Sequence, residues 1–138
     1  MLKFKKVHPD AKVPLKATDG SAGYDLYAVS RVFINSKTVK YDTGIAFEIP
    51  KGYVGLLFPR SSVIKKGLSM GNSVGVIDSD FRDSVSAVFY VDEGDTVYDV
   101  GERVCQLVIV PAPQFELVQV DELSETERGT GGFGSTGE

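Results

Sequence analysis

Short segments rich in Val, Ile, Tyr and Phe recur along this chain, and Gly, Asp, Asn and Pro separate them. Such spacing is typical of an all-β domain, and no long segment shows helical periodicity. Within residues 84–91, the side chains of Val85, Ala87 and Phe89 fall on one face, as a half-buried strand requires. We expect further strands at residues 44–49, 53–58, 103–110 and 115–120.

One short helix is expected at residues 61–66. Ser61 or Ser62 would cap its start, and Gly67 would be the left-handed residue after its end. Short strands at this spacing suit a sandwich, a jelly roll or a small barrel, and the pattern alone does not choose among them.

The length of 138 residues and the hydrophobic content of 42% suit one domain with one core. We expect residues 1–120 to form this domain, and residues 121–138, which are acidic and then rich in glycine, to form a flexible arm. A larger active site would therefore have to lie between subunits. The lone Cys105 lies in an apolar run and is expected to be a buried, inert thiol.

The formal net charge of -4 argues against a protein that holds nucleic acid, because Lys and Arg dominate binding to phosphate backbones. No apolar stretch reaches the roughly 18 residues of a membrane span, and the first residues lack the order of a secretion signal. We expect a soluble protein, cytoplasmic or otherwise intracellular, with no membrane and no direct nucleic-acid partner.

The glycine-rich residues 128–137 include one cation, Arg128, and one aromatic ring, Phe133. Glycine lets backbone N–H groups approach phosphate oxygens, arginine binds a phosphate at two points, and a phenyl ring can cover a base. A flexible linker is the alternative, but a plain linker needs neither the arginine nor the phenylalanine. We interpret this segment as part of a nucleotide site.

Two segments nearer the middle of the chain allow two readings each. Arg60, Ser61 and Ser62 at the expected helix start form either an anion site or an ordinary capped helix start. Asp78 and Asp80 point to the same side of an extended segment, so they share either a site or a solvated turn.

Asp25 and Gln106 are polar residues inside apolar strands, and buried polar groups need partners. A phosphate or a hydrated metal would satisfy them; equally, an arginine would satisfy Asp25 and a backbone group Gln106. The sequence disfavours three other kinds of site. His8 is the only histidine, which makes a Ser-His-Asp site improbable, and no His/Cys cluster has zinc spacing. The P-loop pattern for triphosphate binding is absent.

Five segments resemble, in order, the five motifs of trimeric dUTPases, and the resemblance spans residues 22–137. They are residues 22–26, 59–62, 75–82, 101–107 and 128–137. The resemblance implies a jelly-roll-like β barrel (dUTPase-like β-clip) that forms a homotrimer, with the arm of one subunit closing a neighbour's active site. It also implies Mg²⁺-dependent hydrolysis of dUTP to dUMP and diphosphate by water attack on the α-phosphorus. This reaction keeps uracil out of DNA and supplies dUMP for thymidylate synthesis.

The same resemblance assigns roles to individual residues. Asp78 matches the catalytic carboxylate that orients the attacking water. Asp25 would hold the hydrated Mg²⁺ through water, with no direct protein ligand. The expected contacts to phosphate are Arg60, Ser61, Ser62 and Gln106, with Arg128, Gly134, Ser135 and Thr136 at the γ end. The expected contacts to the nucleoside are Asn72, Gly75 and Ile77 around uracil, Phe81 on the deoxyribose, and Phe133 stacked on the base.

Two positions depart from the family pattern: Phe81 stands where Tyr is common, and Asp83 where Gly is usual. We expect the Asp83 carboxylate to point away from the phosphates. The nearest rival function is a dCTP deaminase, which shares the fold but lacks this arm. A second alternative is a nucleotide-dependent switch that binds a regulatory protein partner through the moving arm.

Overall fold

The computed structural model describes residues 1–92 and 96–137, where the regular elements are antiparallel strands and one short helix. This confirms the all-β prediction. Across the same residues, no helix is long and apolar enough to cross a membrane.

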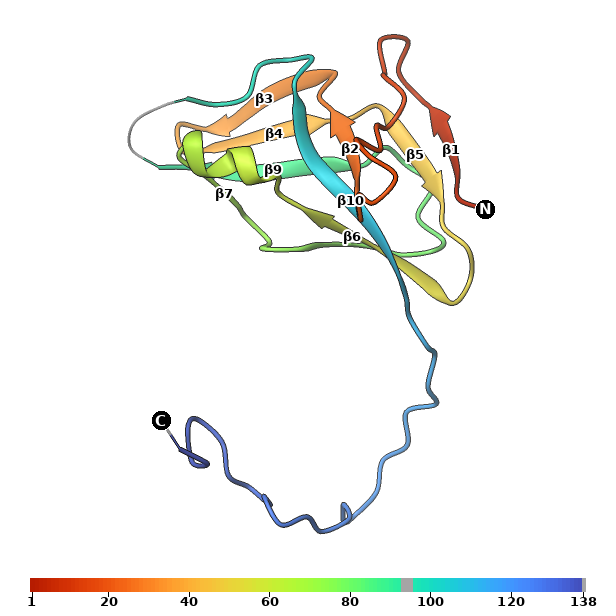
Figure 1. Ribbon diagram of the computed structural model, residues 1–138, viewed down its shortest axis with the longest axis vertical. Helices are drawn as coiled ribbons and strands as arrows, with labels where there is room; N and C mark the ends of the chain where they lie inside the picture. Colours follow the sequence, from red (N-terminus) through yellow and green to blue (C-terminus); the bar gives the residue numbers. More distant parts are fainter. Residues whose placement is uncertain (93–95, 138) are drawn as a thin grey trace.

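Two four-stranded antiparallel sheets and one strand pair make up the body (Figure 1). The first sheet has the order β2 (Tyr24–Tyr27), β10 (Arg103–Pro111), β6 (Tyr53–Phe58) and β8 (Gly75–Ile77). The second has the order β3 (Ser30–Asn35), β4 (Thr38–Asp42), β9 (Ser86–Val91) and β7 (Leu68–Met70). The pair consists of β1 (Lys3–Lys6) and β5 (Ile45–Glu48).

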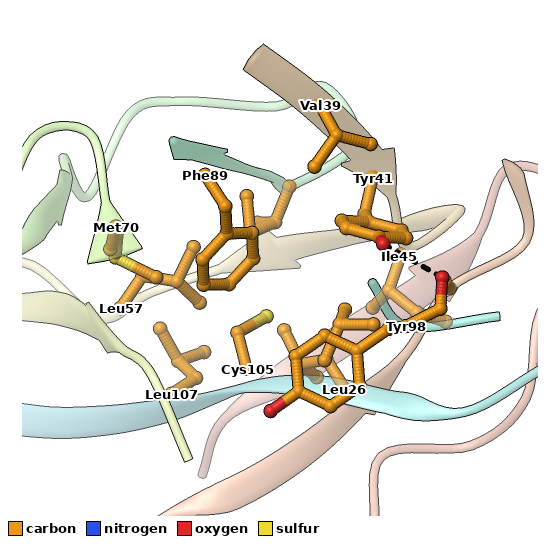
Figure 2. Close-up of a cluster of buried hydrophobic side chains, with 14 of the residues drawn as sticks. Leu26, Val39, Tyr41, Ile45, Leu57, Met70, Phe89, Tyr98, Cys105 and Leu107 are labelled. Atoms are coloured by element: carbon orange, nitrogen blue, oxygen red, sulfur yellow. Dashed lines mark hydrogen bonds between the residues drawn. The ribbon is translucent and has the colours of Figure 1, made fainter. Parts of the chain in front are cut away.

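The hydrophobic core lies between the two four-stranded sheets (Figure 2). The alternation expected within residues 84–91 is confirmed, since Val85, Ala87 and Phe89 are only 1%, 2% and 0% exposed. Cys105 is fully buried, also as expected, and burial raises the pKa of its thiol above the ordinary range. One face of each central strand is therefore fixed, and the opposite face is free to carry polar groups.

The strand predictions hold where a partner strand exists. Residues 53–58 form β6 with the expected bounds, and residues 103–110 lie within β10. Residues 115–120, however, form no strand, so that prediction is wrong for this chain. The segment is rich in strand-forming residues, but it leaves the body, and nothing in residues 1–92 and 96–137 pairs with it (Figure 1).

The short helix, η1 (Ser61–Lys65), is a 3₁₀ turn. The predicted serine cap is wrong, because Arg60 occupies the N-cap position and makes no side-chain cap bond. The Ser62 hydroxyl is instead bonded to the hydroxyl of Tyr98 and to Arg60. Gly67 has φ +59°, which confirms the left-handed residue after the helix.

Candidate active site

Two polar side chains, those of Asp25 and Gln106, lie side by side in the first sheet, on the face opposite the core. Gln106 in the central strand β10 lies opposite Asp25 of β2 on one side and Phe58 of β6 on the other. Their neighbours Leu26 and Leu57 point into the core and are 0% and 2% exposed. Because side chains alternate along a strand, the core packing sets the direction in which Asp25 and Gln106 point.

Asp25 is held by two arginines. Its Oδ2 lies 3.2 Å from Arg60 Nε and 3.0 Å from Arg103 Nη1, and its side chain is only 13% exposed. The arginine alternative for Asp25 is therefore the one the structure shows. Two guanidinium groups around one carboxylate leave a net positive charge, which favours an anion such as phosphate.

Gln106 is also satisfied from within the chain. Its Nε2 donates to the backbone oxygen of Pro59 at 3.0 Å, as the backbone alternative predicted. Gly23 leaves the space for it, since a Cβ added there would lie 2.7 Å from Gln106 Oε1. The side chain thus ties β10 to the segment that carries Arg60.

Ser62 lies beside Arg60, and Tyr98 lies next to Ser62. The Arg60 Nη1 atom donates to Ser62 Oγ and to the backbone oxygen of Arg103, both at 3.3 Å. Ser62 Oγ lies 2.8 Å from the hydroxyl of Tyr98. We call Asp25, Arg60, Ser62, Arg103 and Gln106 the phosphate cluster, after the anion that its charge favours.

The predicted uracil-reading residues lie elsewhere, in the turn between β7 and β8 and in β8 itself. These two strands do not pair with each other, because β7 pairs with β9 whereas β8 pairs with β6. The turn between them has Asn72 before Ser73, whose φ is +60°. A Cβ added to Gly75 would lie 3.0 Å from Leu57 Cβ, so this position is tight.

Asp78 follows β8 at the far end of the first sheet. With Ser79 and Asp80 it lines a hollow of about 410 Å³, together with residues 51–54, Ala112 and Gln114. Asp78 and Asp80 are exposed, but the backbone N–H of Phe81 donates to the backbone oxygen of Asp78 at 3.1 Å. Residues 78–81 therefore form a turn, and not the extended segment for which a shared side was predicted. The Asp83 carboxylate accepts a hydrogen bond from the backbone N–H of Ser84 at 2.7 Å.

The register of the sheet separates Asp78 from the phosphate cluster of the same chain. Ile77 lies opposite Gly55, so Asp78 follows next to Val54. Arg60 is six residues further along the same segment, which corresponds to about 20 Å of extended chain. One copy of the chain therefore does not bring Asp78 to its own Arg60.

The predicted site residues of the arm lie apart from both the phosphate cluster and Asp78. It curves away from the body after β10 (Figure 1), and residues 113–130 are exposed. Near its end, Arg128 Nε donates to the backbone oxygen of Gly131 at 2.8 Å, and the next glycines allow further turns. The ring of Phe133 has no cover, with an exposure of 114%. The last predicted residues, Gly134, Ser135 and Thr136, lie in the same turns.

Two residues of this region escaped the prediction of site residues. Arg103 would face the core by simple alternation with Cys105, but a register shift between them turns it toward Asp25. Gly101, two residues before β10, has φ +94°, which indicates irregular backbone there but does not identify the bulge. Tyr98 lies in an irregular segment, and no sequence signal places its hydroxyl beside Ser62.

Known proteins resemble this chain over nearly its whole length. The protein family described as dUTPase matches residues 9–137. The deoxyuridine 5′-triphosphate nucleotidohydrolase of Hydrogenobaculum sp. is 41% identical, covering 99% of this chain and 97% of that protein. Its counterpart from Escherichia phage T5 is 42% identical and covers 99% of both. A solved structure of the Staphylococcus bacteriophage 80alpha dUTPase with dUPNHPP has a TM-score of 0.87 at 30% identity, covering 100% of this chain and 99% of that one.

Proposed function

This chain belongs to the dUTPase family and is a dUTP diphosphatase, and from this premise we propose how its residues carry out the reaction. Asp78 orients a water molecule, which attacks the α-phosphorus of dUTP. The bond from that phosphorus to the bridging oxygen breaks, and dUMP and diphosphate leave. Most of the rate enhancement comes from positioning and from neutralisation of phosphate charge, because a carboxylate is a modest base.

The observation that carries this proposal is the phosphate cluster. Arg60 and Arg103 are both fixed by Asp25, so the two cations are in place before an anion arrives. Prearranged guanidinium groups bind phosphate oxygens strongly and with defined direction. Arg60, Ser61, Ser62 and Gln106 therefore hold the triphosphate.

The separation of Asp78 from Arg60 supports an active site built from more than one subunit. About 20 Å of extended strand lies between them in one chain, whereas both must reach a single substrate. A homotrimer with closed symmetry repeats such a shared site at every subunit boundary. In this arrangement the jelly-roll-like body, residues 1–120, supplies Asp78 to the phosphate cluster of a neighbour.

The arm, residues 121–138, closes the site from a neighbouring subunit. Its exposed apolar residues support this role, because Phe133 and the linker residues Phe115 and Leu117 have exposures of 114%, 87% and 99%. Side chains of this kind gain free energy when another surface covers them. Phe133 stacks on the uracil, and the γ-phosphate contacts are Arg128, Gly134, Ser135 and Thr136.

Base selection belongs to the turn before β8. Asn72 and the backbone near Gly75 and Ile77 read the uracil edge, and the tight packing of Gly75 on Leu57 supports a pocket too narrow for thymine. The Phe81 ring is 42% exposed and is free to pack on the deoxyribose, where it leaves no room for a 2′-hydroxyl.

Members of the dUTPase family use Mg²⁺. Within the described residues, no three His, Cys, Asp or Glu side chains are grouped to hold a metal ion. Mg²⁺ would be held mainly by the substrate phosphates and water, as this ion prefers. Asp25 would hold the hydrated ion through its waters, while its carboxylate also pairs with two arginines. When bound, Mg²⁺ neutralises charge on the phosphates.

Diphosphate release from dUTP tests the proposal, with dTTP, dCTP and UTP as control nucleotides and EDTA as the metal control. We expect hydrolysis of dUTP alone, abolished by EDTA. Ammonia release from dCTP would instead identify a deaminase. Equal hydrolysis of dUTP and dTTP would contradict the narrow pocket.

A further inference from the structure

Tyr98 connects the hydrophobic core to the phosphate cluster. Its side chain comes from an irregular segment, is 1% exposed and lies among the core residues (Figure 2). The ring packs at an angle against Tyr41 and Phe89, with centroids 6.1 Å away in both cases. At the other end of the ring, the hydroxyl lies 2.8 Å from Ser62 Oγ.

The Tyr98 ring is held at several points. The backbone oxygen of Tyr98 accepts hydrogen bonds from the Tyr41 hydroxyl at 2.7 Å and from Arg31 Nη1 at 3.1 Å. The Lys66 Nζ atom lies over the ring, 5.2 Å from its centroid. The phenol oxygen is thus a fixed point beside η1, whereas a serine hydroxyl on its own rotates freely.

The partners of Ser62 decide where its hydroxyl hydrogen points. Arg60 Nη1 lies 3.3 Å from Ser62 Oγ and can only donate, so Ser62 accepts there. Either oxygen could donate across the 2.8 Å contact between Ser62 Oγ and the Tyr98 phenol. We take the phenol as the donor, because it is buried and Ser62 Oγ is its partner within residues 1–92 and 96–137. With both lone pairs occupied, the serine directs its own hydrogen away from Arg60 and Tyr98.

We propose that Tyr98 is a positioning residue, which sets the Ser62 hydroxyl as a donor toward a phosphate oxygen of dUTP. This inference rests on the proposed role of the phosphate cluster. A donor that already points at the anion needs no reorientation on binding, so it strengthens the complex. Ser62 contacts the phosphates before and during the reaction, and Tyr98 therefore affects binding of substrate more than the chemical step.

The test is Tyr98→Phe, which keeps the ring and removes only the hydroxyl. Losing one oriented hydrogen bond corresponds to a rise of about fivefold in the KM for dUTP. We expect the same rise in the Kd of the non-hydrolysable analogue dUpNHpp, measured by calorimetry, with kcat changed less than about twofold.

Two further variants separate positioning from packing. In a Ser62→Ala background, Tyr98→Phe should have no additional effect on KM, because the hydroxyl that it orients is gone. Thr43→Val is the matched control, since it removes another buried hydroxyl, which donates to the backbone oxygen of Val85 and not to Tyr98. We expect that control to lower the melting temperature and to leave KM unchanged.

Wild-type KM and Kd in Tyr98→Phe would overturn the inference. An equal rise in the Ser62→Ala background would overturn it too, because Tyr98 would then act through packing. Failure of the underlying function is seen separately in the unsubstituted protein: if that protein neither binds dUpNHpp nor hydrolyses dUTP, both proposals are wrong.

Discussion

Asp25 decides the geometry of the phosphate cluster, because one carboxylate fixes two guanidinium groups. We expect Asp25→Asn to lower the free energy of unfolding by about 1–3 kcal/mol, since it leaves two partly buried cations without a countercharge. Hydrolysis of dUTP should fall at least tenfold. Thermal unfolding followed by circular dichroism, together with a diphosphate assay, checks both effects.

The matched control is Glu48→Gln, which breaks an exposed pair with Lys3. The side chains of that pair are 67% and 48% exposed, so the loss of stability should be much smaller than in Asp25→Asn. Similar losses in the two variants would mean that Asp25 contributes only as a surface charge.

Gly23 makes room for Gln106, and a methyl group there would displace the amide from Pro59. We expect Gly23→Ala to reduce kcat/KM for dUTP several-fold, because the phosphate cluster would lose one support. Gly20→Ala serves as control, since a Cβ at Gly20 meets open space. Unchanged kinetics in Gly23→Ala would show that the position of Gln106 is not needed.

Ionisation of the buried Tyr41 should make the stability of the folded state depend on pH above about 10. Burial raises its pKa from 10.0 to about 12, partly opposed by Arg31. The folded state holds this proton more tightly, so the stabilisation is complete below about pH 10 and is lost as the pH rises toward 12. We expect stability to fall by roughly 2 kcal/mol over that range, measured by urea unfolding, and Tyr41→Phe should show a shallower fall. Identical pH profiles would contradict this.

Among the elements, the sequence was most informative where a strand has both a core face and a partner. The run of strand-forming residues at 53–58 predicts β6 with its observed bounds, because core packing and pairing act on the same residues. Asp25 and Gln106 were identifiable as site candidates because each interrupts an apolar strand. The bulge that turns Arg103, the 3₁₀ geometry of η1 and the position of Tyr98 depend on tertiary contacts, which local patterns do not contain.

The segment at 115–120 shows that a strand-like sequence forms no strand when it has no partner. Its pattern suits a strand, yet the part of the chain that the structure describes offers it no partner strand. Removal of residues 121–138 should leave the melting temperature of the body within a few degrees, because the described residues of the arm are mostly exposed and form no hydrogen bond to the body. Hydrolysis of dUTP should fall strongly. A shortened protein with full activity would exclude the arm from the site.

For the whole molecule, we propose that each active site combines Asp78 of one subunit with Arg60 of another. The separation of the two residues along β6 and its continuation supports this combination. The net charge of -4 is then no obstacle to phosphate binding, because the cations that matter are gathered in one cluster.

Subunit mixing tests this claim directly. Asp78→Asn and Arg60→Gln should each abolish hydrolysis, and both proteins should be refolded separately and as an equal mixture. If the residues act across a boundary, random assembly restores up to about a quarter of the sites, because one site in four receives both intact residues. Recovery of dUTP hydrolysis near that fraction is the predicted result. No recovery in a mixture shown to contain mixed oligomers would place both residues in one chain's site and contradict the proposed assembly.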